Sequence, residues 1–328
     1  MTTYLIRRLL LIFPTLLIAS VIVFFAIRLI PGDVIDALVD QRAGAAIEFN
    51  RASLERALGL DAPIHVQYAR WLGIAPFDDD VGYNGILQGS LGRSLWKPLD
   101  VTEVLIQRLP VTFELGLMAI VIALAVSFPV GIYSAIRQEN WIDYLGRSVA
   151  ITGLAIPSFW IGIMIILYGS ITFGWSPPIF YIPFMENPIE NIGQFIIPAA
   201  IMGLAMSATN MRMTRTMMLE VLRQDYIRTA WAKGLRERVV VIRHALKNAM
   251  IPVITIIGLQ LPVLVGGSVI MEQIFNLPGL GRLMVDAAHL RDYTILSGAM
   301  LLIAVAILLA NLLTDLSYAW LDPRIRYK

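Results

Sequence analysis

The segment Glu220–Asn248, with the sequence EVLRQDYIRTAWAKGLRERVVVIRHALKN, is a polar and basic stretch between two long apolar runs. Residues 211–250 contain nine Lys/Arg and three Asp/Glu, which is a net charge of +6. The pattern predicts two short helices joined at Gly234, because glycine takes a positive φ or lets another backbone come close. A loop of this charge is expected at a membrane surface, with the apolar runs on either side crossing the bilayer.

Helical periodicity assigns faces to the two short helices. In the first helix, Tyr226, Ala230 and Lys233 lie near one face, and Ile227 and Trp231 lie near another. In the second helix we expect an apolar stripe made of Val239, Ile242, Leu246 and Ala249. The residues expected to face away from that stripe are Arg236, Arg243 and Lys247.

The composition is that of a membrane protein. The 328 residues are 57% hydrophobic and 15% charged, with a mean hydropathy of +0.71, whereas globular domains carry about 25% charged residues. The net charge of +2 indicates no acidic or nucleic-acid partner. The chain has no cysteine, and its three histidines are far apart in sequence, so we expect no metal site.

Six apolar runs are long enough to cross a hydrocarbon core of about 30 Å, so we predict an all-α polytopic membrane protein. The runs are Leu9–Ile30, Phe113–Ile136, Ser148–Phe173, Phe195–Met211, Ile251–Met271 and Ile295–Trp320. The first run exceeds the roughly 7–15 residues of a signal-peptide core, so it is expected to be retained. Packed membrane helices tolerate the prolines in or near the runs, at 129, 157, 198 and 262.

The distribution of Lys/Arg predicts the orientation. With the N-terminus inside, the inside segments hold sixteen Lys/Arg, and the two short outside loops hold two, Arg282 and Arg291. Both termini are therefore expected to be cytoplasmic.

The long segment 31–110 falls outside the membrane in this scheme. It has seven Lys/Arg and eleven Asp/Glu, a net charge of −4. We expect short helices at Ser53–Leu58 and Ile64–Leu72, and a solvated turn rather than a calcium site at Asp78–Asp80. The expected organisation is 1–30 (N-terminus and first helix), 31–110 (extracytoplasmic cap), 111–320 (five-helix core containing the loop 212–250) and 321–328 (cytoplasmic tail).

Several chemistries are missing from the sequence. There is no G-x-x-x-x-G-K-[ST], because none of the four lysines follows a glycine, and there is no H-E-x-x-H or G-x-S-x-G motif. We therefore expect neither an ATP site nor a catalytic role in this chain. Charges in the runs are few and near the ends (Arg28, Glu114 and Asp315), which counts against a secondary transporter. A membrane-anchored sensor built on 31–110 would need far fewer spans.

Uncharged polar residues in the runs are candidates for a translocation pathway, with helix packing as the alternative role for each. They are Ser158, Ser207, Gln260 and Ser268.

The central loop resembles the EAA loop of ABC importer permeases, in the form used by the dipeptide/oligopeptide permease family. The resemblance rests on the stretches 225–235 (DYIRTAWAKGL) and 243–249 (RHALKNA). Ala230, Gly234 and Leu246 match the general pattern. Positions 228, 229, 244 and 247 carry Arg, Thr, His and Lys in place of Glu, Ala, Ile and Pro.

Further stretches resemble the same family, in the expected order along nearly the whole chain. They are YLIRR at 4–8 with PGD at 31–33, GSLGRS at 89–94, EQIFNLPGLG at 272–281 with RDY at 291–293, and YAWLDPR at 318–324. In the GSLGRS stretch, Ser90 stands where an Asp is common in the family. The glycines of the PGLG turn, Gly279 and Gly281, are expected to be structural.

The resemblance implies a type I ABC importer permease fold in a bacterial inner membrane. It also implies a heterodimer with a second, homologous permease, two ATPases that carry ATP and magnesium, and an extracytoplasmic solute-binding protein. Di- or oligopeptides are the expected substrates, and nickel, glutathione or oligosaccharides are the alternatives within the family. The residues it assigns to ATPase coupling are Asp225, Tyr226, Arg228, Thr229, Ala230, Lys233, Gly234, Leu235 and Arg236.

Overall fold

The computed structural model describes residues 2–29, 60–76, 82–96 and 99–321. Within these ranges the chain is helical, and the only strand-like feature is an isolated antiparallel bridge between Arg93 and Asp100. The predicted helix at 53–58, the turn at 78–80 and the tail at 322–328 lie outside the described residues.

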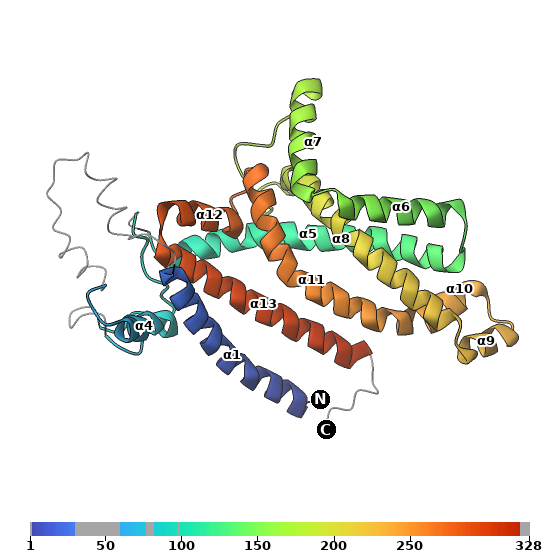
Figure 1. The fold of residues 1–328 in the computed structure, drawn as a ribbon, viewed down its shortest axis with the longest axis horizontal. Coiled ribbons are helices and arrows are strands. Elements are labelled where there is room, and N and C mark those ends of the chain that lie inside the picture. The colour runs from blue at the N-terminus through green and yellow to red at the C-terminus, as the bar shows by residue number, and fades with distance from the viewer. Residues whose placement is uncertain (1, 30–59, 77–81, 97–98, 322–328) are drawn as a thin grey trace. The chain divides into compact units, whose positions relative to one another are not determined.

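The helices are shown in Figure 1. They are α1 (Thr2–Arg28), α4 (Ile64–Leu72), α5 (Val101–Ile136), α6 (Trp141–Ala155), α7 (Ser158–Phe173), α8 (Pro188–Leu222), α9 (Asp225–Ala232), α10 (Glu237–Val239), α11 (Lys247–Ile274), α12 (Leu280–Leu290) and α13 (Tyr293–Leu321). A short 3-10 helix covers Ile86–Gln88, and a π-helical segment covers Val240–Leu246.

Among the described residues, five helices are long and apolar enough to cross a membrane, and a bent pair makes a sixth if it is counted as one span. The five stretches are Arg8–Arg28, Val101–Ile136, Pro188–Leu222, Glu237–Pro262 and Tyr293–Ser317. This agrees with the predicted all-helical membrane protein and with the six apolar runs.

The third run, predicted as one continuous span over Ser148–Phe173, is instead broken. Helices α6 and α7 meet at 92°, and the break falls at Ile156 and Pro157. A residue before proline is driven out of the helical region, and Ile156 accordingly has φ −92° and ψ 124°. Tolerance of proline in packed helices holds for Pro198 and Pro262, which lie inside α8 and α11, but not for Pro157.

The fourth run, predicted to be the shortest, belongs to one of the longest helices. Helix α8 has 35 residues and is therefore about 52 Å long. It begins at a cap in which the Asn187 side chain accepts a hydrogen bond from the Glu190 N–H. The apolar run ends at Met211 because Arg212 follows, but Met, Leu, Glu and Arg are good helix formers and continue the helix to Leu222.

The described chain divides into two compact units. The first comprises Met1–Ile6, Val111–Gly281 and Ile307–Lys328, and the second comprises Arg7–Pro110 and Arg282–Ala306. This division differs from the predicted one, which follows the sides of the membrane and remains a prediction.

The first unit is built around α8, which packs against α6, α7 and α11. Its main core contains Phe195, Ala199 and Met202 of α8, Leu115 and Ala119 of α5, and a cluster at the end of α11. Where α5 meets α8 the backbones come close, because a Cβ added at Gly203 would lie 2.6 Å from the Ala119 carbonyl oxygen.

Two amide side chains of α8 hold the connection between α7 and α8. Asn191 donates to the Ile182 carbonyl at 3.0 Å, and Gln194 donates to the Phe180 carbonyl at 3.0 Å. Burial and the carboxylates of Glu114 and Glu186 raise the pKa of Tyr181 in this connection.

In the second unit, an aromatic cluster joins α1 to α4. The Phe24 ring packs at 5.1 Å from that of Tyr68, and the Tyr68 hydroxyl is 2.8 Å from the Ser20 hydroxyl. Helix α4 has the predicted bounds, because Pro63 precedes it and Gly73 ends it with φ 85°. Near the start of α13, the Ser94 hydroxyl donates to the buried carboxylate of Asp292.

Candidate functional site

Helix α9 is the first of the two predicted short helices, and one of its faces is buried. Ile227 and Ala230 are buried, whereas Tyr226 and Trp231 are each 44% exposed. Ile227 and Ala230 are three residues apart and therefore lie on the same face of the helix. Ala230 thus packs against the chain itself. The predicted faces are wrong, because Ala230 is buried together with Ile227, whereas Tyr226 and Trp231, which were expected to share their faces, are exposed.

The remaining residues assigned to coupling are exposed. Arg228 forms an ion pair with Asp225 at 3.4 Å, but the two side chains are 76% and 95% exposed, so the pair adds little stability. The Thr229 hydroxyl bonds back to the Asp225 carbonyl at 3.0 Å. The exposed turn that follows contains Lys233, Gly234, Leu235 and Arg236.

Gly234 joins the two halves of the loop with φ 73°. Its N–H donates to the Trp231 carbonyl at 2.9 Å, and the Leu235 N–H donates to the Ala230 carbonyl at 3.4 Å. These two bonds form a Schellman motif, which ends a helix with a left-handed residue. A Cβ at Gly234 would meet nothing within 4 Å, so the positive φ, rather than a close approach within this chain, requires glycine here.

The second half of the loop is helical, but its buried stripe differs from the predicted one. Val240, Val241, Ala245 and Ala249 are buried, whereas Val239 and Ile242 are 36% and 51% exposed. Val240–Leu246 is π-helical, with i→i+5 hydrogen bonds in place of the α-helical period that the prediction assumed. In this segment, residues five positions apart lie on one face, so Val240 and Ala245 are buried together. The predicted stripe is wrong at Val239 and Ile242.

A polar clasp ties α9 to the second half of the loop. The Asn248 amide donates to the Tyr226 hydroxyl at 2.8 Å and to the His244 carbonyl at 3.2 Å. The Tyr226 hydroxyl also donates to the same carbonyl at 3.4 Å. Tyr226 thus closes the loop on itself.

The loop rests on the ends of α5 and α8 through one hydrophobic cluster. The buried members of this loop cluster are Ala135, Met218, Ile227, Ala230, Val240, Val241, Ala245 and Ala249. An exposed ion pair between Arg137 and Glu237 at 3.1 Å lies beside it. The loop therefore shares a core with the ends of both helices.

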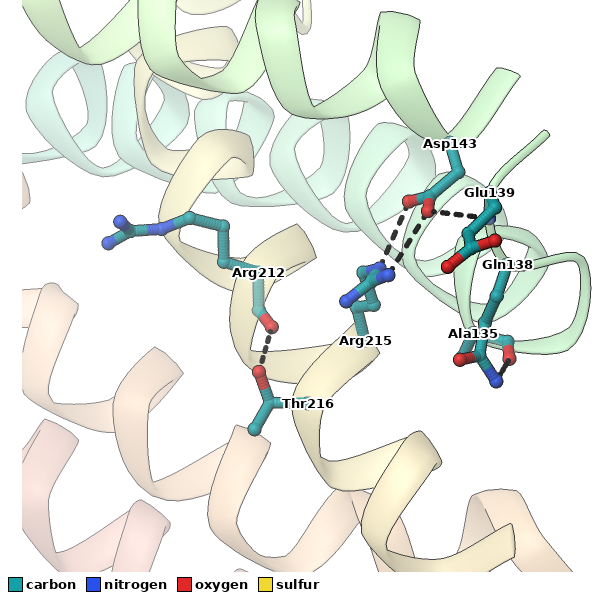
Figure 2. A network of polar contacts seen from close by, with 7 residues as sticks. All are labelled: Ala135, Gln138, Glu139, Asp143, Arg212, Arg215 and Thr216. Atoms are coloured by element: carbon teal, nitrogen blue, oxygen red, sulfur yellow. Dashed lines mark hydrogen bonds and ion pairs between the residues drawn. The ribbon is translucent and has the colours of Figure 1, made fainter. Parts of the chain in front are cut away.

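A buried ion pair fixes α8 to the start of α6 (Figure 2). The Arg215 Nε and Nη2 atoms donate to the two carboxylate oxygens of Asp143 at 3.0 and 3.1 Å, and the Asp143 side chain is fully buried. The Glu139 N–H also donates to this carboxylate at 3.3 Å, from a backbone with φ 61°. Arg212, by contrast, points away from the pair in Figure 2.

The four candidate pathway residues lie on α7, α8 and α11. Ser158 is partly exposed at the start of α7, and the Ser207 hydroxyl bonds back to the Leu204 carbonyl at 2.7 Å. On α11, Ser268 is buried, and the buried Gln260 Oε1 has no hydrogen-bond partner among the described residues. Their role in a pathway remains a prediction.

Sequence reasoning missed the Asp143–Arg215 pair and the exposure of Trp231. Asp143 lies in the first turn of α6, where an acidic residue is ordinary at a helix N-terminus. Only the fold brings it to Arg215. The exposure of Trp231 has no signal in the sequence, because its spacing from Ile227 places the two residues near one face of a helix.

Comparison with known proteins assigns this chain to a family. A family model described as the inner membrane component of binding-protein-dependent transport systems matches residues 127–327. A second one, for the N-terminal part of the membrane component of such systems, matches residues 1–116. The chain belongs to this family. The similarity covers both compact units, so the resemblance seen in the sequence is confirmed.

Relatives of this permease match it from end to end. It is 40% identical over 330 residues to the oligopeptide transport system permease protein AppB of Bacillus subtilis, with 100% of both chains covered. It is 39% identical over 329 residues to a putative peptide transport system permease protein of Brucella abortus, again with full coverage. It is 36% identical over 328 residues to the glutathione transport system permease protein GsiC of Salmonella typhimurium, with full coverage of both chains. These relatives are permease subunits of transport systems rather than enzymes.

A solved structure supports the fold. The inward-facing MetNI methionine ABC transporter contains a chain that this permease matches with a TM-score of 0.52 at 18% identity, over 67% of this chain and 96% of that one. The permease therefore has the expected fold of a type I ABC importer membrane subunit.

Proposed function

We propose that this permease forms half of the translocation pathway of an ATP-driven importer and is coupled to its ATPases through α9 and the Gly234 turn. The observation that carries the proposal is the arrangement of α9. Its exposed side presents Trp231 and charged residues, whereas its buried side joins the core of α8. Aromatic and arginine side chains are the residues that most often anchor protein interfaces.

Each predicted coupling residue would have a defined role in this docking. The exposed side chains of Asp225, Arg228, Thr229, Lys233, Leu235 and Arg236 would contact the ATPase. Ala230 would seat α9 on the permease itself, Tyr226 would close the clasp, and Gly234 would shape the turn. Because α8 is one continuous helix of 35 residues, a displacement of α9 would pass along it as a rigid-body movement.

The partners follow from the same proposal. A second, homologous permease would complete the pathway, two ATPases would bind ATP and magnesium, and a solute-binding protein would deliver the substrate. The excess of Lys/Arg in the loop and at the chain ends supports a bacterial inner-membrane orientation with both termini in the cytoplasm.

Docking through α9 predicts the effect of removing its exposed aromatic side chain. Trp231→Ala should weaken association with the ATPase subunits by about 2 kcal/mol, or roughly 30-fold, because buried tryptophans dominate such interfaces. Gly234→Val should also weaken it, because a β-branched residue is strained at φ 73°. Co-purification of the complex and ATPase binding by permease in nanodiscs measure both effects.

The matched control is Trp141→Ala, which removes a 69% exposed tryptophan of α6, outside the loop. Association should persist in this variant. ATPase binding that is equal in Trp231→Ala and in the unchanged permease would exclude docking through α9.

Peptides are the substrate class that we propose. The relatives named for oligopeptides, peptides and glutathione support it, because glutathione is itself a small peptide. ATP-dependent uptake into proteoliposomes with the complete complex is expected for labelled di- or oligopeptides. Glutathione is the second candidate, favoured by the GsiC relative. Uptake of nickel or an oligosaccharide without peptide uptake would overturn the assignment.

A further inference from the structure

Four polar side chains lie buried where α5 faces α8. Ser127 and Ser134 belong to α5, and Asn210 and Thr214 belong to α8; each is 0% exposed. The three hydroxyl oxygens and both amide atoms of Asn210 make no hydrogen bond to any residue that the structure describes. We call these four residues the polar seam.

The contact between the two helices places the seam residues on facing sides. A Cβ added at Gly131 of α5 would lie 2.9 Å from the Met211 carbonyl oxygen and 2.9 Å from the Thr214 Cβ. Ser127 and Ser134 are four residues before and three residues after Gly131, so they share its face of α5. Asn210 is four residues before Thr214 and shares its face of α8.

Helix α6 closes one side of the seam. A Cβ at Gly146 would lie 3.4 Å from the Met211 Cε and 3.7 Å from the Ser134 hydroxyl oxygen. The Arg215–Asp143 ion pair, one residue beyond Thr214, attaches the same helix to α8. Helices α6 and α8 are therefore joined by a charged contact. At the seam, in contrast, α5 faces α8 across polar groups that have no partner among the described residues.

Several other hydroxyl side chains in the described helices have a partner within their own helix. Ser207 bonds to the Leu204 carbonyl, and Thr216 bonds to the Arg212 carbonyl. Thr255 bonds to the Ile251 carbonyl, and Thr314 bonds to the Ala310 carbonyl. The seam hydroxyls make no such bond. Unpaired polar groups in an apolar interior are costly and are rarely retained without a role.

We propose that the polar seam is a sliding surface, whose groups gain partners when α8 shifts along α5 during the transport cycle. This inference rests on the proposed coupling of α9 to the ATPases, because α8 is the helix that α9 would move. In the second arrangement the Asn210 amide, which both donates and accepts, bonds to the seam hydroxyls. The seam then favours a second state, and small residues let the backbones pass closely. A packed contact between two helices that has two such arrangements is a two-state conformational switch.

Asn210→Leu tests the proposal in the complete complex. Leucine has a similar size but cannot bond in the second arrangement, so it should hold the helices as they are here. We expect ATPase association to be unchanged, the thermal midpoint to be equal or higher, and transport to fall at least about tenfold. Thr216→Ala is the control, because that hydroxyl bonds to its own helix, and its transport should be unchanged.

A cross-link measures the movement itself. Ala123 and Ser207 lie four residues after Ala119 and Gly203, which are in contact, and the chain has no cysteine of its own. The double variant Ala123→Cys/Ser207→Cys should form a disulfide on oxidation without nucleotide, and its yield should drop severalfold in the vanadate-trapped complex.

Three results would overturn the sliding surface. One is full transport by Asn210→Leu, and another is the same disulfide yield in both states. The third is a loss of thermal stability in Asn210→Leu that accounts for its loss of transport, which would assign the seam to bound water that supports the fold. Unchanged ATPase association in Trp231→Ala, which would exclude docking through α9, is a separate measurement from these three, so failure of the docking proposal and failure of the sliding proposal can be told apart.

Discussion

Replacing Asp143 by alanine is expected to lower the free energy of unfolding of the permease by about 3–5 kcal/mol, because it leaves the Arg215 guanidinium without its buried counter-charge. The Asp143 side chain is fully buried, and that of Arg215 is 21% exposed, so water replaces little of the lost interaction. The carboxylate also accepts the Glu139 N–H. Denaturant titration of the purified permease in detergent measures the change.

The chain offers a matched control in its exposed ion pair. Arg137 and Glu237 are separated by a similar distance, 3.1 Å, but their side chains are 55% and 43% exposed. Arg137→Ala should therefore cost less than about 1 kcal/mol. The double variant Asp143→Leu/Arg215→Met removes both charges and should be less destabilised than Asp143→Ala alone. Equal effects of Asp143→Ala and Arg137→Ala would show that burial does not strengthen the pair.

Gly281→Ala is expected to destabilise the permease by about 1–3 kcal/mol through overpacking. A Cβ at Gly281 would lie 2.6 Å from the Val269 Cα and 2.9 Å from the Glu272 Oε2. The Val269 backbone belongs to α11, so the clash cannot be relieved by a rotamer change. The thermal midpoint of the purified permease measures the effect.

Gly279→Ala tests the contact with the Glu272 side chain separately from the contact with the Val269 backbone that Gly281→Ala also makes. A Cβ there would lie 2.3–2.5 Å from the three carboxyl atoms of Glu272. That carboxylate is fully buried and accepts the Thr112 hydroxyl at 2.7 Å, and the same hydroxyl accepts the Leu280 N–H at 2.8 Å. Gly279→Ala should therefore be destabilising, and Glu272→Ala should rescue part of its loss.

Glu272→Ala should not rescue Gly281→Ala to the same extent, because the contact with Val269 remains. Gly193→Ala is the control for adding a methyl group, since a Cβ there would meet nothing within 4 Å. Alanine is also the better helix former, so this variant should be neutral or slightly stabilised. A Gly281→Ala variant as stable as Gly193→Ala would contradict the packing argument.

Local backbone preferences were readable from the sequence. The bounds of α4 follow from Pro63 and Gly73, and the joint of the central loop follows from Gly234, whose φ is 73°. Both depend on what proline and glycine do to their own dihedral angles. The apolar runs were readable for a similar reason, because a membrane span needs only length and hydropathy.

The two-helix form of the central loop was predicted, but the contacts within it were not all predicted. The predicted faces of α9 were wrong, because Ala230 is buried with Ile227, whereas Lys233 and Trp231 are exposed. The stripe of the second helix was wrong at Val239 and Ile242, because periodicity assumes an α-helix and Val240–Leu246 is π-helical. Only packing on the end of α8 decides which hydrogen-bond register that segment adopts.

The sequence by itself determined that this chain is a helical membrane protein, which of its stretches are long and apolar enough to span a bilayer and which loop is basic, because these are properties of short stretches. The tertiary structure alone decided that α6 and α7 meet at 92° and that Asp143 pairs with Arg215. It also decided that Gly279 and Gly281 lie against Glu272. A buried charge needs a partner brought by another part of the chain, and the space beside a glycine is set by what packs there, so neither can be read from neighbours in sequence.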